Sequence, residues 1–219
     1  MIKIKRNITY RIYKRDEVIV FKKTKELYGG LSNMASGYAI YINGEKILSS
    51  EALYQAMRYP DNPEIQREIL VQKSPMTAKM ISKKYRNLSR TDWDQVRIII
   101  MRWCLRIKLL NNWNEFSSLL LSTGDKNIVE ESHKDDFWGA IPSDKNLLVG
   151  TNALGRLLME LRKDLHSLKD VNQLNINIPN IKLYNKNLST LVINVQKNTD
   201  ISTNNKHYYQ KYKNLTLFD

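Results

Sequence analysis

The chain has 219 residues and a formal net charge of +13, from 35 basic and 22 acidic side chains. Its hydrophobic content of 42% is enough for the core of one domain with an appendage, and it excludes a chain too polar to fold. No apolar run approaches the roughly 20 residues of a membrane-spanning helix, and the N-terminus lacks the apolar block of a signal peptide, so we expect a cytoplasmic protein without a membrane partner.

The first expected element is a basic strand region. Between residues 2 and 22 apolar and basic positions alternate, as in one or two β-strands, and residues 1–25 carry nine basic side chains against two acidic ones. This charge favours an anionic partner such as nucleic acid, with simple solubility as the alternative. A β-hairpin should follow at residues 38–48, because Asn43-Gly44 suits a tight type I′ turn between alternating runs.

The hairpin leads into a helix whose first turn carries Glu51. Ser49 is a suitable N-cap, and an acid in the first turn complements the helix dipole, so Glu51 can be explained as a helix-starting residue. At spacings of three and four, however, Glu51, Tyr54 and Gln55 share one helix face. A structural cap does not need these polar partners, so a catalytic role for Glu51 stays open beside the structural one.

Helices are expected along most of the chain from residue 61 to residue 168. Pro63 and Ser74-Pro75 mark two helix starts, and Thr91 is the expected cap of a long helix. That helix has a stripe of apolar residues at helical spacing, namely Trp93, Val96, Ile100, Trp103, Cys104, Ile107 and Leu110. Cys104, the single cysteine, is expected to be buried and inert, and the three histidines lack metal-ligand spacing, so we expect no metal and no cofactor.

The later part of the chain contains two changes of character. Helices expected at 113–122 and 152–168 flank the segment 123–139, which holds five acidic residues and is either a solvated loop or one wall of a cleft. From residue 171 onward, 11 of 49 residues are Asn, and Lys and Tyr alternate near the end. This Asn/Lys-rich extension, 171–219, either recruits nucleic acid or packs on the domain through strands between Ile181 and Val195.

The polar segments, taken in order, resemble the NADAR, or YbiA-like, family. The matching pieces lie between residues 28 and 165 and are Leu31-Ser32-Asn33, Glu51 with Tyr54-Gln55, Ser74-Pro75 with Ala78-Lys79, Arg90 with Asp92-Trp93, Thr123-Gly124-Asp125, Glu130 with Ser132, Asp135 with Trp138-Gly139, and Gly150 with Asn152, Leu154-Gly155 and Leu158-Met159. The resemblance implies a mainly helical α+β domain at 26–170, with a small β-hairpin, between the N-terminal strand region 1–25 and the extension. It also implies an enzyme that hydrolyses N-glycosidic bonds of ribosyl nucleotides.

By this resemblance Glu51 and Asp135 are the catalytic carboxylates. The implied substrate contacts are Asn33, Gln55, Arg58, Lys79, Trp93, Glu130, Trp138 and Asn152. The residue types suit the chemistry, because a carboxylate stabilises the positive charge that builds on the sugar as its C–N bond breaks, or activates water. A second acid can protonate the leaving nitrogen if burial raises its pKa.

Two activities are associated with the family. One removes ADP-ribose from modified guanine in nucleic acid, and the other hydrolyses phosphoribosylamino-pyrimidine intermediates of riboflavin synthesis. The basic ends favour the first, which makes an ADP-ribosylated nucleobase or nucleic acid the expected partner and an ADP-ribosyltransferase toxin the opposing activity. Ala52, Arg58 and Ile141 depart from the family pattern, which leaves open a module that binds ADP-ribose without cleaving it. Arg58 remains protonated, so it cannot be an amine nucleophile.

Overall fold

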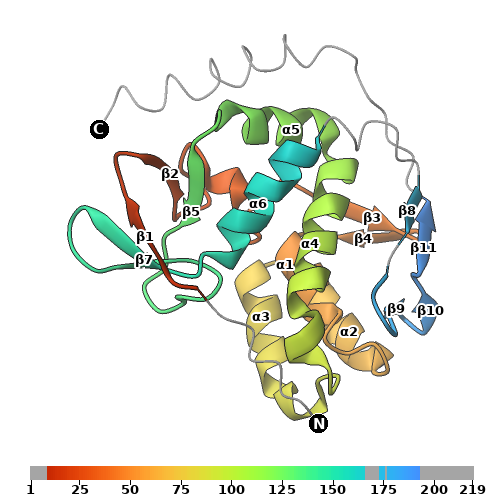
Figure 1. Ribbon diagram of the computed structural model, residues 1–219. Coiled ribbons are helices and arrows are strands. Elements are labelled where there is room, and N and C mark those ends of the chain that lie inside the picture. The colour runs from red at the N-terminus through yellow and green to blue at the C-terminus, as the bar shows by residue number, and fades with distance from the viewer. Residues whose placement is uncertain (1–8, 166–172, 176, 193–219) are drawn as a thin grey trace.

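Short strands surround a central group of helices in the computed structural model, which describes residues 9–165, 173–175 and 177–192 (Figure 1). In chain order the elements are β1 (Arg11–Lys14), β2 (Val18–Phe21), the 3-10 helix η1 (Gly29–Leu31), β3 (Ile40–Ile42), β4 (Glu45–Ile47), α1 (Ser50–Ala56), α2 (Pro63–Leu70), α3 (Pro75–Lys84), the 3-10 helix η2 (Arg86–Leu88), α4 (Trp93–Asn111), α5 (Trp113–Ser122), β5 (Asn127–Glu130), β6 (Ile141–Pro142), β7 (Leu147–Gly150), α6 (Ala153–Asp164), β8 (Gln173–Asn175), β9 (Lys182–Leu183), β10 (Lys186–Asn187) and β11 (Thr190–Val192). The predicted α+β, mainly helical class is confirmed. In these residues every helix falls short of the length and apolar character that crossing a bilayer requires.

Helix α4 runs through the middle of the molecule (Figure 1). All seven residues of its predicted apolar stripe are less than a tenth exposed, as the helical spacing indicated. Cys104 is fully buried, and burial raises the pKa of its thiol well above the usual value. The expected cap, Thr91, is wrong by one position: the helix begins at Trp93 and Asp92 precedes it. Arg90 holds the Asp92 carboxylate at 2.6 and 2.9 Å, outside the helix.

The predicted hairpin and the start of α1 form as expected. Strands β3 and β4 are antiparallel, and Asn43 and Gly44 have φ of 50° and 84°, the positive values that a type I′ turn requires. The hairpin delivers the chain to Ser49, whose Oγ accepts the N–H of Ala52 at 3.2 Å and caps α1. Helix α1 packs against α2, α3 and α4, and all its residues are buried. Its first turn, with Glu51, therefore lies inside the molecule.

The N-terminal strands pair with strands from the second half of the chain. Strand β1 pairs with β7 in the antiparallel sheet β1-β7-β6, and β2 pairs with β5 in parallel. Strand β5 lies in the acidic segment 123–139, where a loop was one of the two interpretations. Its residues Ile128 and Val129 are fully buried, but two apolar residues between polar neighbours are too short a run to predict a strand. Residues 11–21 thus belong to the same folded unit as the helices.

Residues 177–192, the described part of the C-terminal extension beyond β8, contribute to the main core. The buried apolar residues of this segment are Ile178, Ile181, Leu183 and Leu188. Gln66 of α2 holds the segment at two points, because its Nε2 donates to the carbonyl of Lys182 and its Oε1 accepts the N–H of Tyr184, both at 2.8 Å. Of the two roles considered for the extension, this segment has the packing role. The Lys- and Tyr-rich end lies outside the described residues.

Candidate active site

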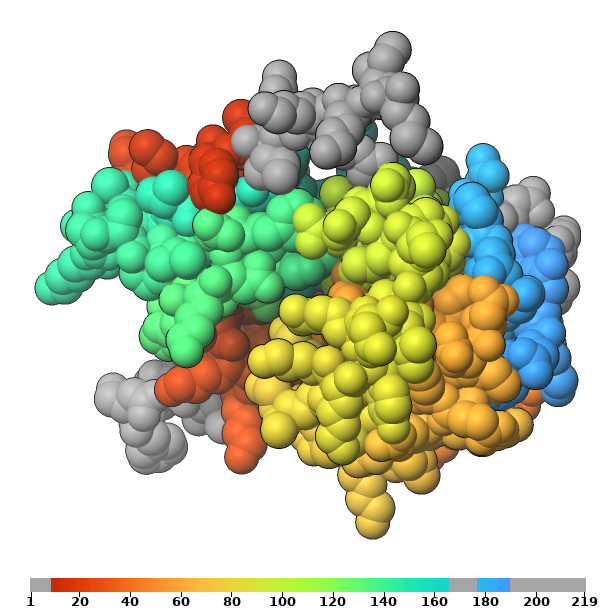
Figure 2. Space-filling view, turned by 90° about the horizontal axis from the view of Figure 1, so that it is seen from below, coloured from red at the N-terminus to blue at the C-terminus, as the bar shows by residue number. Residues whose placement is uncertain are grey.

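A cleft of about 620 Å³ opens between α3, in yellow, and the green segment that follows β5 (Figure 2). Nine of the ten site residues named from the sequence line it: Asn33, Glu51, Gln55, Arg58, Lys79, Trp93, Glu130, Asp135 and Trp138. Asn152 is not among the lining residues. It is fully buried, its Nδ2 donates to the carbonyl of Ile128 at 2.8 Å, and its Oδ1 accepts the N–H of Glu130 at 3.1 Å. Asn152 therefore connects the start of α6 to β5 and positions Glu130 through its backbone, rather than contacting the cleft itself.

Glu51 lines this cleft and is only 6% exposed. Its Oε1 accepts a hydrogen bond from Nε2 of Gln55 at 2.8 Å. The Oε1 of Gln55 accepts from the hydroxyl of Ser82 at 2.7 Å, which fixes the amide with its nitrogen toward Glu51. Burial raises the pKa of Glu51, while Lys79, Gln55 and Arg58 favour its ionised form. Ser49 caps α1, so the helix does not need Glu51 as its cap. The burial of Glu51 and its hydrogen bond with Gln55 favour a chemical role instead.

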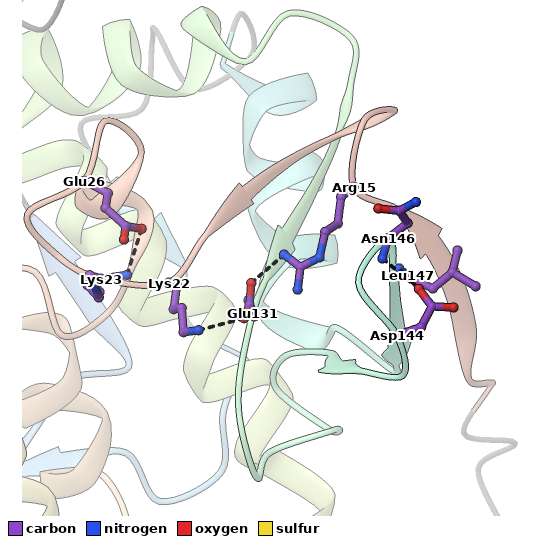
Figure 3. A network of polar contacts seen from close by, with 8 residues as sticks. All are labelled: Arg15, Lys22, Lys23, Glu26, Glu131, Asp144, Asn146 and Leu147. Atoms are coloured by element: carbon purple, nitrogen blue, oxygen red, sulfur yellow. Dashed lines mark hydrogen bonds and ion pairs between the residues drawn. The ribbon is translucent and has the colours of Figure 1, made fainter. Parts of the chain in front are cut away.

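Two consecutive glutamates at the end of β5 have opposite electrostatic environments. Glu131 accepts hydrogen bonds from Arg15 at 2.6 Å and Lys22 at 2.8 Å, and the bond from Arg15 above all lowers its pKa (Figure 3). For Glu130, burial and then the charges of Asp135 and Glu51 raise the pKa to about 7. A carboxyl group that keeps its proton close to neutral pH is a candidate general acid. The sequence had placed Glu130 only among the ligand contacts.

Asp135 shapes the turn that follows β5. Its Oδ1 accepts the backbone N–H groups of Phe137 at 3.1 Å and Trp138 at 2.8 Å. Trp138 packs edge-on against Tyr54, with ring centroids 5.6 Å apart, and the ring centroid of Tyr54 also lies 5.1 Å from that of Trp93. The three rings form an aromatic wall of the cleft. Asp135 therefore has a structural task, holding Trp138 in this wall, beside the catalytic role implied by the resemblance.

A buried lysine on α4 supports the turn that carries Asn33. Lys108 is fully buried, its Nζ donates to the carbonyls of Gly30 at 2.6 Å and Ser32 at 3.0 Å, and burial lowers its pKa to about 7. The carbonyl of Asn33 in turn accepts the backbone N–H of Glu51 at 3.2 Å. This chain of contacts has no signal in the sequence, because Lys108 lies among apolar residues of a helix that also carries three partly exposed arginines, Arg97, Arg102 and Arg106.

Several further cleft residues were missed from the sequence: Met76, Met80, Ser82, Lys83, Arg86, Arg97, Met101, His133 and Phe137. On α3, Met76, Met80 and Lys83 recur at spacings of four and three, and the side chains of both methionines are more than half exposed. The spacing of Met76 and Met80, which puts them on one face of α3 close to Lys79, was the available signal in the sequence. Within the part of the chain that the structure describes, no cluster of His, Cys, Asp or Glu is arranged to hold a metal ion.

Comparison with known proteins finds similarity over most of the chain, in both sequence and structure. The family model of the NADAR domain matches residues 20–166. A riboflavin biosynthesis protein of Vibrio vulnificus (strain YJ016) is 35% identical over 150 residues, which cover 68% of this chain and 39% of that protein. N-glycosidase YbiA of Escherichia coli (strain K12) is 34% identical over 151 residues, which cover 69% of this chain and 90% of YbiA. The NMR structure of E. coli YbiA matches with a TM-score of 0.58 and 31% identity, covering 72% of this chain and 95% of that one. The chain thus spans under half of the Vibrio protein and most of YbiA.

Proposed function

This chain belongs to the NADAR family, and on that premise we propose that it is an N-glycosidase that removes ADP-ribose from modified guanine in nucleic acid. The observation that carries the proposal is one cleft in which buried Glu51 lies near Glu130, whose pKa is raised to about 7. The relatives that are named N-glycosidases support the class of reaction. The net charge of +13 supports a polyanionic substrate.

The two glutamates suit the two charges that develop during cleavage. As the ribosyl C–N bond breaks, the sugar becomes positive and the leaving nitrogen becomes negative. The ionised carboxylate of Glu51 stabilises the sugar cation, and the protonated carboxyl of Glu130 donates its proton to the leaving nitrogen. Water then adds to the anomeric carbon and returns a proton to Glu130. Arg58 takes no part as a nucleophile, because a guanidinium stays protonated.

The second candidate function is hydrolysis of phosphoribosylamino-pyrimidine intermediates, and it is favoured by the similarity to the riboflavin biosynthesis protein of Vibrio vulnificus. The deciding experiment offers the protein both an oligonucleotide with ADP-ribosylated guanine and the free aminopyrimidine phosphate, and measures turnover of each. We expect faster turnover of the oligonucleotide. A large preference for the free intermediate would overturn the proposal in favour of the second candidate.

A non-catalytic module is the third possibility, and Ala52, Arg58 and Ile141 are the departures that motivate it. Calorimetry with ADP-ribose, combined with an assay for free guanine over several hours, separates it from an enzyme. Tight binding without release of base would support a module. Steady release of base would exclude it.

For an active enzyme in the cytoplasm, the opposing activity would be an ADP-ribosyltransferase that modifies guanine, such as a toxin.

The raised pKa of Glu130 predicts how activity depends on pH. If protonated Glu130 is the general acid, kcat/KM falls as the pH rises through about 7, and Glu130→Gln removes this descending limb. We expect Glu130→Gln to be slower below neutral pH by on the order of 10- to 100-fold. The raised pKa also means that Glu130 binds its proton more tightly in the folded protein than in the unfolded chain. The free energy of unfolding therefore decreases as the pH rises from the ordinary carboxyl pKa toward 7. An unchanged descending limb in Glu130→Gln would assign the titration to another group.

Asp135→Asn separates the charge of Asp135 from its structural task. The asparagine keeps an oxygen for the N–H groups of Phe137 and Trp138, so the melting temperature should change little. We expect the rate of base release to fall by about 10-fold or more because the negative charge near the sugar is lost. Asp136→Asn is the control, since the Oδ2 of Asp136 accepts the hydroxyl of exposed Tyr10 at 2.9 Å. Full activity in Asp135→Asn would leave Asp135 with the turn alone.

A further inference from the structure

Two arginines in the cleft are stacked on aromatic rings. The guanidinium carbon of Arg58 lies 4.1 Å from the ring centroid of Trp93, and that of Arg97 lies 3.9 Å from the ring centroid of Phe137. All four residues line the cleft. Stacking holds each guanidinium plane against a flat surface, which limits its motion and leaves the N–H groups at the edge of the plane. The two groups are therefore presented in fixed orientations.

Neither guanidinium has a hydrogen-bond acceptor among the residues that the structure describes. The Nε of Arg58 and of Arg97 are both enclosed and without a hydrogen-bond partner. The ion pair of Arg97 is a loose contact of 3.8 Å with Asp94, whose side chain is 85% exposed. By contrast, Arg90 and Arg102 each donate two hydrogen bonds to a carboxylate. Because both guanidinium groups line the cleft and neither donates to an acceptor in the described residues, Arg58 and Arg97 can donate their outer N–H groups to a ligand.

The charges around Arg58 connect this pair to the carboxylates of the site. Burial above all, and also the charge of Arg86, lowers the pKa of Arg58. The charge of Arg58 in turn favours the ionised form of Glu51. Arg58 is thus close enough to interact electrostatically with both Glu51 and Arg86, another cleft residue. A ligand in the cleft can therefore lie beside Glu51 and within reach of the charge of Arg58.

We propose that Arg58 and Arg97 form a phosphate site that binds the phosphate or diphosphate ester on the 5′ side of the ribose whose glycosidic bond lies at Glu51. This assignment rests on the proposed N-glycosidase function. A planar guanidinium matches phosphate oxygens with paired N–H donors, and two such groups suit the two phosphorus centres of a diphosphate. The site selects phosphorylated ribosides over neutral ones. Binding phosphate is also a role that Arg58 can fill while it stays protonated.

The test compares three substrates that share one base and differ in the sugar substituent: a ribosyl, a 5′-phosphoribosyl and an ADP-ribosyl derivative. For Arg97→Gln we expect KM to rise by on the order of 10- to 100-fold for the two phosphorylated substrates, with kcat and the neutral riboside little affected. Arg156→Gln, an equal change of charge at an exposed position of α6 outside the cleft, is the control. Equal losses with all three substrates would overturn the phosphate site. If Arg97→Gln does not fold, Arg97→Lys keeps the charge without the planar fork and takes its place.

Binding of inorganic pyrophosphate, measured by calorimetry, provides a readout that does not depend on catalysis. We expect the wild-type protein to bind pyrophosphate and Arg97→Gln to lose at least tenfold in affinity. Asp94→Asn, which removes the negative charge 3.8 Å from Arg97, should bind about two- to fivefold more tightly. Pyrophosphate binding that needs Arg97, together with no base released from any substrate, would overturn the proposed function and leave the phosphate site standing. Binding unaffected by Arg97→Gln would overturn the site.

Discussion

Glu51→Gln lowers the rate of base release by on the order of 100-fold or more, with ligand affinity largely retained, if Glu51 stabilises the sugar cation. Glutamine has nearly the same shape as glutamate, and Ser49 remains as the cap of α1, so the helix start is kept. What is lost is the negative charge beside the anomeric carbon. Single-turnover cleavage of an ADP-ribosylated oligonucleotide measures the rate, and calorimetry with ADP-ribose measures the affinity.

Glu64→Gln is a matched control for this experiment. Glu64 is also an acid in the first turn of a helix, α2, but its side chain is 81% exposed and pairs with Arg67 on the surface. Both variants remove one charge from a helix N-terminus, and only one removes it from the cleft. Similar small effects of the two substitutions would assign Glu51 to the helix dipole, the structural role that the sequence left open.

A chain that ends at residue 170 is expected to lose most of its stability. The truncation removes the four buried residues of the segment 177–192, and each buried aliphatic side chain contributes about 1.5–3 kcal/mol. The total is comparable with the roughly 5–15 kcal/mol by which a whole domain is stable. We expect the melting temperature to fall by on the order of 15 °C or more, or the protein to be insoluble, with activity on every substrate lost in parallel. Thermal denaturation followed by circular dichroism measures the change.

A chain that ends at Val192 keeps this packing and removes only residues 193–219. Its melting temperature and its activity on a short substrate should match those of the full chain. If the Lys and Tyr residues near the end recruit nucleic acid, its activity on long modified strands should fall, and most at low salt, where phosphate contacts contribute most to affinity. If the chain that ends at residue 170 has the same melting temperature as the full-length protein, the segment 177–192 adds nothing to stability.

The sequence predicted best those features that depend on neighbours along the chain. The Asn43-Gly44 turn, the cap at Ser49 and the apolar stripe of α4 all follow from a few adjacent residues. Most of the cleft residues named from the sequence were identified because the polar segments occur in the same order as in the NADAR family. Local signals and the family pattern together were enough to bring Glu51 and Glu130 into one site.

The features that were not predicted depend on contacts between distant parts of the chain. The pairing of β2 with β5 has no local signal, and the burial of Lys108 depends on the carbonyls of Gly30 and Ser32, far from it in sequence. Asn152 was expected to contact the ligand, yet its amide is used by the backbone of β5. The raised pKa of Glu130 depends on the surrounding charges, and these become neighbours only in the fold.

The parallel pairing of β2 with β5 also bears on how the protein is made. Val18 lies opposite Asn127, 109 positions further along the chain, so this contact closes a long loop and is slow to form. Because synthesis begins at the N-terminus, β2 is made before β5, and its backbone edge cannot pair until the intervening helical residues and β5 have followed. Glu130 is the last residue of β5. We therefore expect Glu130 to reach its place in the cleft only after this long-range pairing has formed.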